Sequence, residues 1–169
     1  RGEGLKLPGG IAFGTLDVHA RVAPGNTADI RDDLAAREMQ IDVAATKFVM
    51  PAGAFGTLRA GVAGTLAQHA LTLAMKSEDL DLSASARGGL DLARKSADMA
   101  AATWNGTLET LENRGVFAVQ LTAPATVQLA RARVRIGATR LAVADGNMRL
   151  AEFAWDDGRI TTSGSYTGV

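Results

Sequence analysis

Few residues of this chain have the type and spacing that chemistry requires. His19 and His69 are the only histidines, and both occupy the same position of a repeated heptapeptide, Gly-Thr-Leu-x-x-His-Ala. Imidazoles are common metal ligands, so this repeat raises the question of a shared metal site. The alternation of apolar and polar residues, however, places His19 among polar neighbours and His69 among apolar ones. Because side chains on opposite faces of a sheet do not meet at one ion, we predict structural roles for both.

The acidic residues also lack a catalytic arrangement. Asp156 and Asp157 are adjacent, whereas glycosidase chemistry needs two carboxyl groups that face each other across a cleft. Asp157 followed by Gly158 is instead typical of a tight hairpin turn. No serine is grouped with a histidine and an acid, and the paired glycines lack the lysine of a phosphate-binding loop. We therefore expect no enzymatic activity, no catalytic residues, no metal and no cofactor.

A basic pattern is the third candidate for chemistry. Arg131, Arg133 and Arg135 alternate with other residues, and Arg140 is nearby. On a strand the first three would share one face. They would meet anionic lipid head groups or an acidic partner, or they would form a solvated face whose charges oppose edge-to-edge aggregation. We favour the solvated face as the simpler interpretation.

The composition indicates a sheet with a smooth apolar surface. The chain has 169 residues, enough for one domain, and its 18 basic and 18 acidic residues leave no net charge to attract nucleic acid. Hydrophobic residues make up 47% of the chain, but aromatic residues only 5%, so the apolar side chains are mostly small and aliphatic. The absence of cysteine excludes disulfides and cysteine-ligated metals.

Alternating apolar and polar residues predict β-strands along most of the chain. Sequences typical of turns separate these strands and predict an antiparallel meander. The expected turns are Pro24-Gly25-Asn26, Pro51-Ala52-Gly53, Arg87-Gly88-Gly89, Asn113-Arg114-Gly115, Asp145-Gly146-Asn147 and Asp157-Gly158. Two segments, residues 27–38 and 90–103, fit a short helix or a long connection instead.

One face of nearly every predicted strand is apolar, and no amphipathic helix is expected to cover it. Such a sheet must close as a sandwich or barrel, or curl into a trough, and the scarcity of large side chains favours the trough. We predict one all-β domain over residues 1–169, a single long curved antiparallel sheet that forms a U-shaped trough with an apolar interior. The expected lining residues are Leu16, Val18, Ile41, Val43, Leu71, Leu73, Leu80, Leu82, Val119, Leu121, Val134, Ile136, Leu141 and Val143.

Several segments in the second half of the chain together resemble the TamB family, which belongs to the AsmA-like proteins of Gram-negative bacteria. The segments are WNGTLETLEN (residues 104–113), FAVQLTAPA (117–125), LAVADG (141–146) and FAWDDGRITTSGSYTGV (153–169). The resemblance extends from about residue 56 to the end, whereas residues 1–55 share only the general style. Each motif is degenerate alone, and the order and spacing of the set carry the resemblance.

The resemblance implies a long periplasmic protein that an N-terminal helix, absent from this sequence, anchors in the inner membrane. It also implies a β-rich body in the form of a U-shaped sheet, of which this chain would be an internal segment. Members of the family are associated with phospholipid transport between the inner and outer membranes. They are also associated with the assembly of outer-membrane β-barrels, together with a TamA-like barrel partner.

We expect the first of three functions, and the other two are its alternatives. The first is a groove that conducts phospholipid by contact with the acyl chains. The second is a chaperone whose groove or sheet edge receives a nascent outer-membrane protein strand by β-augmentation. The third is an inert spacer in which the apolar face is a closed core.

Overall fold

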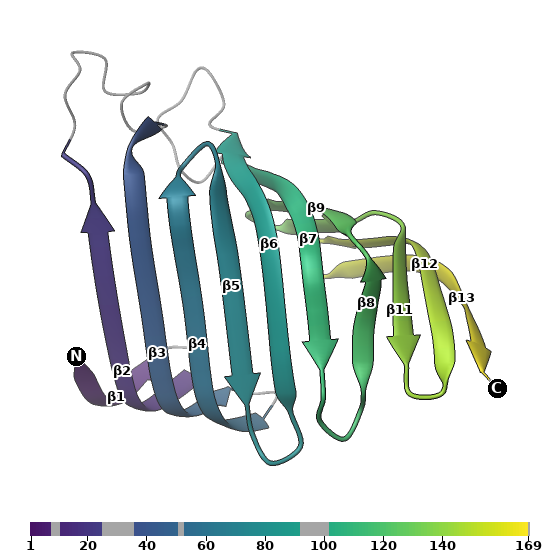
Figure 1. The fold of residues 1–169 in the computed structure, drawn as a ribbon, viewed down its shortest axis with the longest axis horizontal. Helices are drawn as coiled ribbons and strands as arrows, with labels where there is room; N and C mark the ends of the chain where they lie inside the picture. Colours follow the sequence, from purple (N-terminus) through teal and green to yellow (C-terminus); the bar gives the residue numbers. More distant parts are fainter. Residues whose placement is uncertain (8–10, 25–35, 51–52, 92–101, 169) are drawn as a thin grey trace.

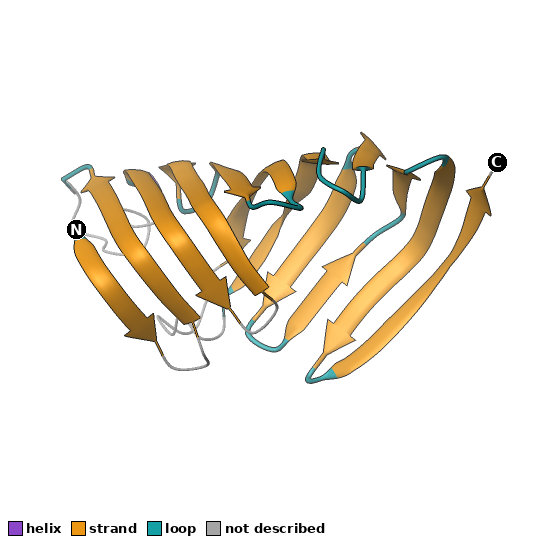
Figure 2. Cartoon of the chain, turned by 90° about the horizontal axis from the view of Figure 1, so that it is seen from below, coloured by secondary structure: helices purple, strands orange, loops and turns teal. Residues whose placement is uncertain are grey.

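The computed structural model describes residues 1–7, 11–24, 36–50, 53–91 and 102–168, and within them it forms one 13-stranded sheet. Every strand pair is antiparallel, and all elements drawn in Figure 2 are strands or loops, which confirms the predicted all-β class. The strands are β1 (Gly2–Leu7), β2 (Ile11–Val22), β3 (Glu38–Met50), β4 (Gly53–Thr65), β5 (His69–Lys76), β6 (Asp81–Asp91), β7 (Thr103–Asn113), β8 (Val119–Ala123), β9 (Ala125–Ala130), β10 (Arg133–Ile136), β11 (Thr139–Val143), β12 (Gly146–Asp156) and β13 (Arg159–Gly168).

The strands form where apolar and polar residues alternate. In β5, for example, Leu71, Leu73 and Met75 are half-buried, whereas Thr72 and the other residues between them are exposed. This burial pattern has the period of two expected of a strand whose two faces meet different surroundings. The sequence predicts either a short helix or a long connection for residues 27–38 and 90–103. Both segments fall mostly outside the described residues.

The chain runs up and down across the sheet in sequence order from β1 to β8 (Figure 1). Beyond β7, two long strands are each divided into halves. β8 pairs with the C-terminal part of β7, and β9 pairs with its N-terminal part. Likewise, β11 pairs with the N-terminal part of β12, and β10 pairs with its C-terminal part. The meander therefore continues to β13, with β8–β9 and β10–β11 each acting as one interrupted strand.

The interruptions lie at neighbouring positions, where the sheet bends. Pro124 separates β8 from β9, and the Gly137 N–H donates to the Thr126 carbonyl at the break between β10 and β11. The ladder also shifts register between Leu150 and Glu152 in β12. Proline removes a ladder donor and bulges bend strands. In Figure 1 the segments beyond these breaks turn away from the upright ones and run behind the front of the sheet.

The predicted turns are partly right. Asp157 and Gly158 connect β12 to β13 with φ angles of 45° and 84°, the left-handed conformation that a two-residue hairpin turn requires. The prediction at Asp145-Gly146-Asn147 is displaced by one residue, because Ala144 and Asp145 make the turn, whereas Gly146 begins β12 and pairs with Val143. Arg87-Gly88-Gly89, however, is wrong as a turn, because all three residues lie inside β6 and pair with β7.

Little of the apolar material is buried. Among the described residues, the buried hydrophobic side chains are Ala45, Phe48, Trp104, Leu121, Ala125 and Leu141. The accessible surface is 11485 Å², whereas a compact globular protein of this mass exposes about 7,900 Å². The sheet is therefore extended, and its packing is mostly contact between neighbouring strands.

Candidate functional site

The cross-strand register gathers the apolar side chains on one face of the sheet, which we call the apolar face. In the first half of the chain, successive strands place apolar residues directly opposite one another in rows. One such row crosses β2 to β7 and consists of Val18, Val43, Ala60, Leu73, Ala84 and Leu111. The adjacent row, one residue along each strand, lies on the opposite face. It is polar or small, and consists of His19, Asp42, Gly61, Thr72, Ser85 and Thr110.

The apolar face continues into the second half of the chain through β7. Leu108 and Leu111 of β7 pack against a cluster of Leu121, Ala125 and Leu141. Further residues around this cluster are Val119, Ile136, Val143 and Met148. The same face therefore extends from the N-terminal strands to β12 without a break in its apolar character.

The structure places the predicted lining residues in positions that agree with a shared face. All of them lie in strands except Leu80, which is in the turn between β5 and β6. Leu121 and Leu141 are buried, Val18 is 50% exposed, and the remainder are half-buried. Half-burial on an open sheet leaves each side chain with part of its surface free for contact. Their role as the lining of a lipid groove remains a prediction.

The apolar face also contains residues that were not among the predicted lining residues. Leu58 and Val62 of β4 follow the ordinary alternation, and this signal was present in the sequence. Leu108 and Leu111 are three residues apart, and only a register shift in the β6–β7 ladder turns both to the same face. Because a bulge adds one residue, it interrupts the period of two on which strand prediction depends.

A buried pair of polar rings lies at one end of this face. The Trp104 Nε1–H donates to His69 Nε2 at 2.8 Å, and His69 Nδ1 is 2.9 Å from the Thr65 carbonyl oxygen. A neutral imidazole with its proton on Nδ1 satisfies both contacts, which assigns the tautomer. Both side chains are less than a tenth exposed. His69 therefore has the structural role predicted for it, and it joins the β4–β5 turn to β7.

Glycines make room for the tryptophan ring. Gly88 and Gly106 are directly paired across β6 and β7. A Cβ atom on Gly106 would lie 2.3 Å from the Trp104 ring, and one on Gly88 would lie 2.6 Å from it. Any side chain at either position would push the ring away. Gly89 has a different neighbour, since a Cβ atom there would clash with the backbone of Ala67.

The other histidine lies on the opposite face, as predicted. His19 of β2 is directly opposite Asp42 of β3, and both are exposed. Within the described residues, no three histidine, aspartate or glutamate side chains are grouped closely enough to hold a metal ion. His19 and His69 lie on opposite faces of strands that are not neighbours in the sheet, so they are not brought together.

The polar face carries exposed ion pairs. Lys76 pairs with Asp81, Arg87 with Glu109, Arg114 with Glu112, and Arg133 with Asp156. The hydrogen bonds from Arg114 to Glu112 and the attraction between their charges raise the pKa of Arg114. Of the basic pattern read from the sequence, Arg133 is thus neutralised by a neighbour. Exposed pairs of this kind contribute little to stability.

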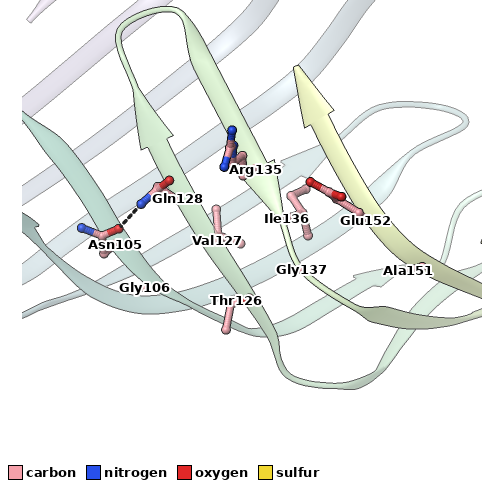
Figure 3. Close-up of a pocket in the computed structure, with 10 residues that line it drawn as sticks. All are labelled: Asn105, Gly106, Thr126, Val127, Gln128, Arg135, Ile136, Gly137, Ala151 and Glu152. Carbon is pink, nitrogen blue, oxygen red and sulfur yellow. Dashed lines mark hydrogen bonds between the residues drawn. The ribbon is translucent and has the colours of Figure 1, made fainter. Parts of the chain in front are cut away.

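An open depression of about 530 Å³, lined by polar and apolar residues, lies over the second half of the sheet (Figure 3). Gln128 donates a hydrogen bond to Asn105 at 2.8 Å, and Arg135 and Glu152 are also part of the lining. Glu152 is the only carboxylate among these lining residues. The depression therefore does not supply the two facing carboxyl groups of a glycosidase.

Comparisons with known proteins add no assignment, since no protein-family model, curated protein or solved structure matches the chain. No helix within the described residues has the length and apolar character needed to span a membrane.

Proposed function

We propose that this chain is a periplasmic segment of a TamB-like protein and that its apolar face conducts phospholipid between the inner and outer membranes. The observation that carries the proposal is the continuous row-by-row apolar face, whose aliphatic side chains are mostly half-buried. An internal core would bury these side chains against a second layer, and the few buried residues argue against the spacer function.

The chemistry of the face suits acyl chains. Its side chains are mostly alanine, valine, leucine, isoleucine and methionine, which offer dispersion contacts and no directed hydrogen bonds. Burial of a methylene group is worth roughly 0.8 kcal/mol, so a sixteen-carbon chain would gain about 12 kcal/mol before ordering costs. Small side chains form no deep pocket for any one methylene, so the lipid can slide along the strands. The direction of transport would then come from the membranes at either end.

The place of the segment in the cell follows from the family resemblance. In this proposal the whole protein is anchored in the inner membrane by an N-terminal helix and crosses the periplasm. Its outer-membrane partner is a TamA-like barrel. The apolar face curls around the lipid as a trough, with the head group at the wet rim.

Native mass spectrometry of the gently purified chain, with lipid extraction alongside, tests this function. We expect bound phospholipid and uptake of an apolar fluorescent dye by the lipid-free chain, because the apolar face is open to solvent. A clean mass without lipid, combined with no dye uptake, would contradict the proposal and favour a closed β structure.

A second candidate function is supported by the edge of the sheet. β13 pairs only with β12, every residue of it is exposed, and Arg159 is its only charged residue. Sheet edges that avoid pairing usually carry charges, prolines or bulges that block it. This edge fits a chaperone that receives a nascent outer-membrane strand by β-augmentation.

Proline substitution in β13 separates the two functions. We expect one of the neighbouring variants Thr161→Pro and Thr162→Pro to lose a ladder bond to β12 and to unfold more easily. In the other variant the lost N–H points outward, so stability is kept and only an incoming strand is blocked. Capture of a synthetic barrel-strand peptide and lipid occupancy are measured for both. If the stable variant captures the peptide as well as the wild type does, the edge is not the binding surface.

A further inference from the structure

Two arginines face each other on the polar face of the second half of the sheet. Arg140 of β11 is directly opposite Arg149 of β12 in the antiparallel register. Side chains in such a pair have Cβ atoms about 5 Å apart, and like charges there are destabilising. Neither guanidinium makes an ion pair or a side-chain hydrogen bond with any described residue. Arg133, by contrast, is held by Asp156 through a contact of 3.2 Å.

The surroundings of this arginine pair, Arg140 and Arg149, leave space for a ligand. The next residues across the ladder are small, Ala123 on β8 and Ser165 on β13. Together with Gly164 they line a depression of about 810 Å³. The neighbouring residue of β11 on the other face, Leu141, is buried in the core cluster and holds the backbone in place. The two guanidinium groups therefore project from the β11–β12 ladder beside open space.

We propose that the arginine pair binds a phosphate-type oxyanion. Each guanidinium offers planar N–H donors in a fork that matches phosphate oxygens, and a doubly charged anion between the two groups would remove their repulsion. The oxyanion comes either from free phosphate or from the phosphate of a phospholipid head group. Because the pair is on the face opposite to the apolar one, the site does not depend on the lipid-conducting function.

The first test is denaturant unfolding at increasing phosphate concentration, with ionic strength held constant by chloride. An anion that binds the folded state raises the unfolding midpoint with concentration. We expect this rise in the wild type, and we expect Arg140→Gln combined with Arg149→Gln to weaken phosphate binding at least about tenfold. Without phosphate, the double variant should be at least as stable as the wild type, because the like-charge contact is gone.

The matched control is Arg131→Gln combined with Arg159→Gln, which removes the same charge from exposed residues that do not line the depression, in the turn after β9 and at the start of β13. It should respond to phosphate as the wild type does. A wild-type midpoint that phosphate does not move, or a double variant as responsive as the wild type, overturns the proposal. In the wild type, NMR signals of the Arg140 and Arg149 Nε–H groups should shift with phosphate, a readout that needs no variant.

Vesicles distinguish the two sources of the oxyanion. The protein is floated with vesicles of phosphatidylglycerol in phosphatidylcholine. If the arginine-pair variant no longer floats with the vesicles and the control variant still does, the oxyanion is a lipid head group. Phosphate-dependent stabilisation without flotation assigns free phosphate. If the arginine-pair variant and the control variant lose flotation and the phosphate response equally, the attraction is unspecific and the proposal is overturned. Lipid occupancy of the apolar face, measured by native mass spectrometry, should be unchanged in the arginine-pair variant.

Discussion

Leu82→Asp is expected to abolish the co-purification of phospholipid while leaving the sheet folded. Leu82 lies on the apolar face, paired with Met75 of β5, and is half-buried. A carboxylate there would have to lose water when an acyl chain covers it, which costs several kcal/mol. On an open face, however, the same carboxylate remains hydrated in the lipid-free chain, so folding is largely retained. Native mass spectrometry measures the lipid, and circular dichroism measures the β structure.

The adjacent residue provides a close control. Ser83→Asp adds the same charge to the same strand, but Ser83 is exposed on the polar face. It should keep the bound lipid. Val143→Asp, near the buried cluster in the second half of the sheet, should repeat the effect of Leu82→Asp if one continuous path exists. Undiminished crosslinking of lipid to the apolar face of folded Leu82→Asp would count against the conduit.

Trp104→Ala is expected to lower the free energy of unfolding by about 3–5 kcal/mol, the usual cost of emptying a buried tryptophan site. Trp104 is 7% exposed and is one of the few buried side chains in the described part of the chain. Its removal also leaves the buried His69 Nε2 without its donor. The glycines beneath the ring, Gly88 and Gly106, have no side chains that could fill the space. Equilibrium unfolding in urea measures the change.

Two further variants identify the source of this effect. Trp155→Ala removes a tryptophan that is only half-buried, and it should cost clearly less. Trp104→Phe keeps most of the ring packing and deletes the hydrogen bond, so it should cost about 1–3 kcal/mol through the unsatisfied imidazole. If Trp104→Ala and Trp155→Ala lower the free energy of unfolding equally, the His69–Trp104 pair does not stabilise the fold more than a half-buried tryptophan does.

The alternation of residue types was sufficient to predict the all-β class and most strands. A strand exposes its two faces to different surroundings at every second residue, so Leu71, Leu73 and Met75 identify β5 without any knowledge of its neighbours. The Asp157-Gly158 turn was predictable for a similar local reason, since its φ angles suit few other residues. The residues of the apolar face in regular strands follow from the same local pattern.

Local patterns failed where a distant contact decided the outcome. Gly88-Gly89 has the composition of a turn, but both residues lie in β6, where Gly88 makes room for the ring of Trp104 and Gly89 for the backbone of Ala67. The bulge in the β6–β7 ladder brings Leu108 and Leu111 to one face, and its position is a property of two paired strands. Neither contact is visible in a single stretch of sequence.

The sequence by itself therefore determined the fold class, the Asp157-Gly158 turn and the presence of an apolar face, because each depends on residues close together in the chain. The tertiary structure decided which residues meet across the ladders. It placed Trp104 against His69, and it placed Arg149 opposite Arg140, whereas the sequence had grouped Arg140 with Arg131, Arg133 and Arg135. Register is set by the packing of whole strands against each other, and a shift of one residue would exchange the two faces.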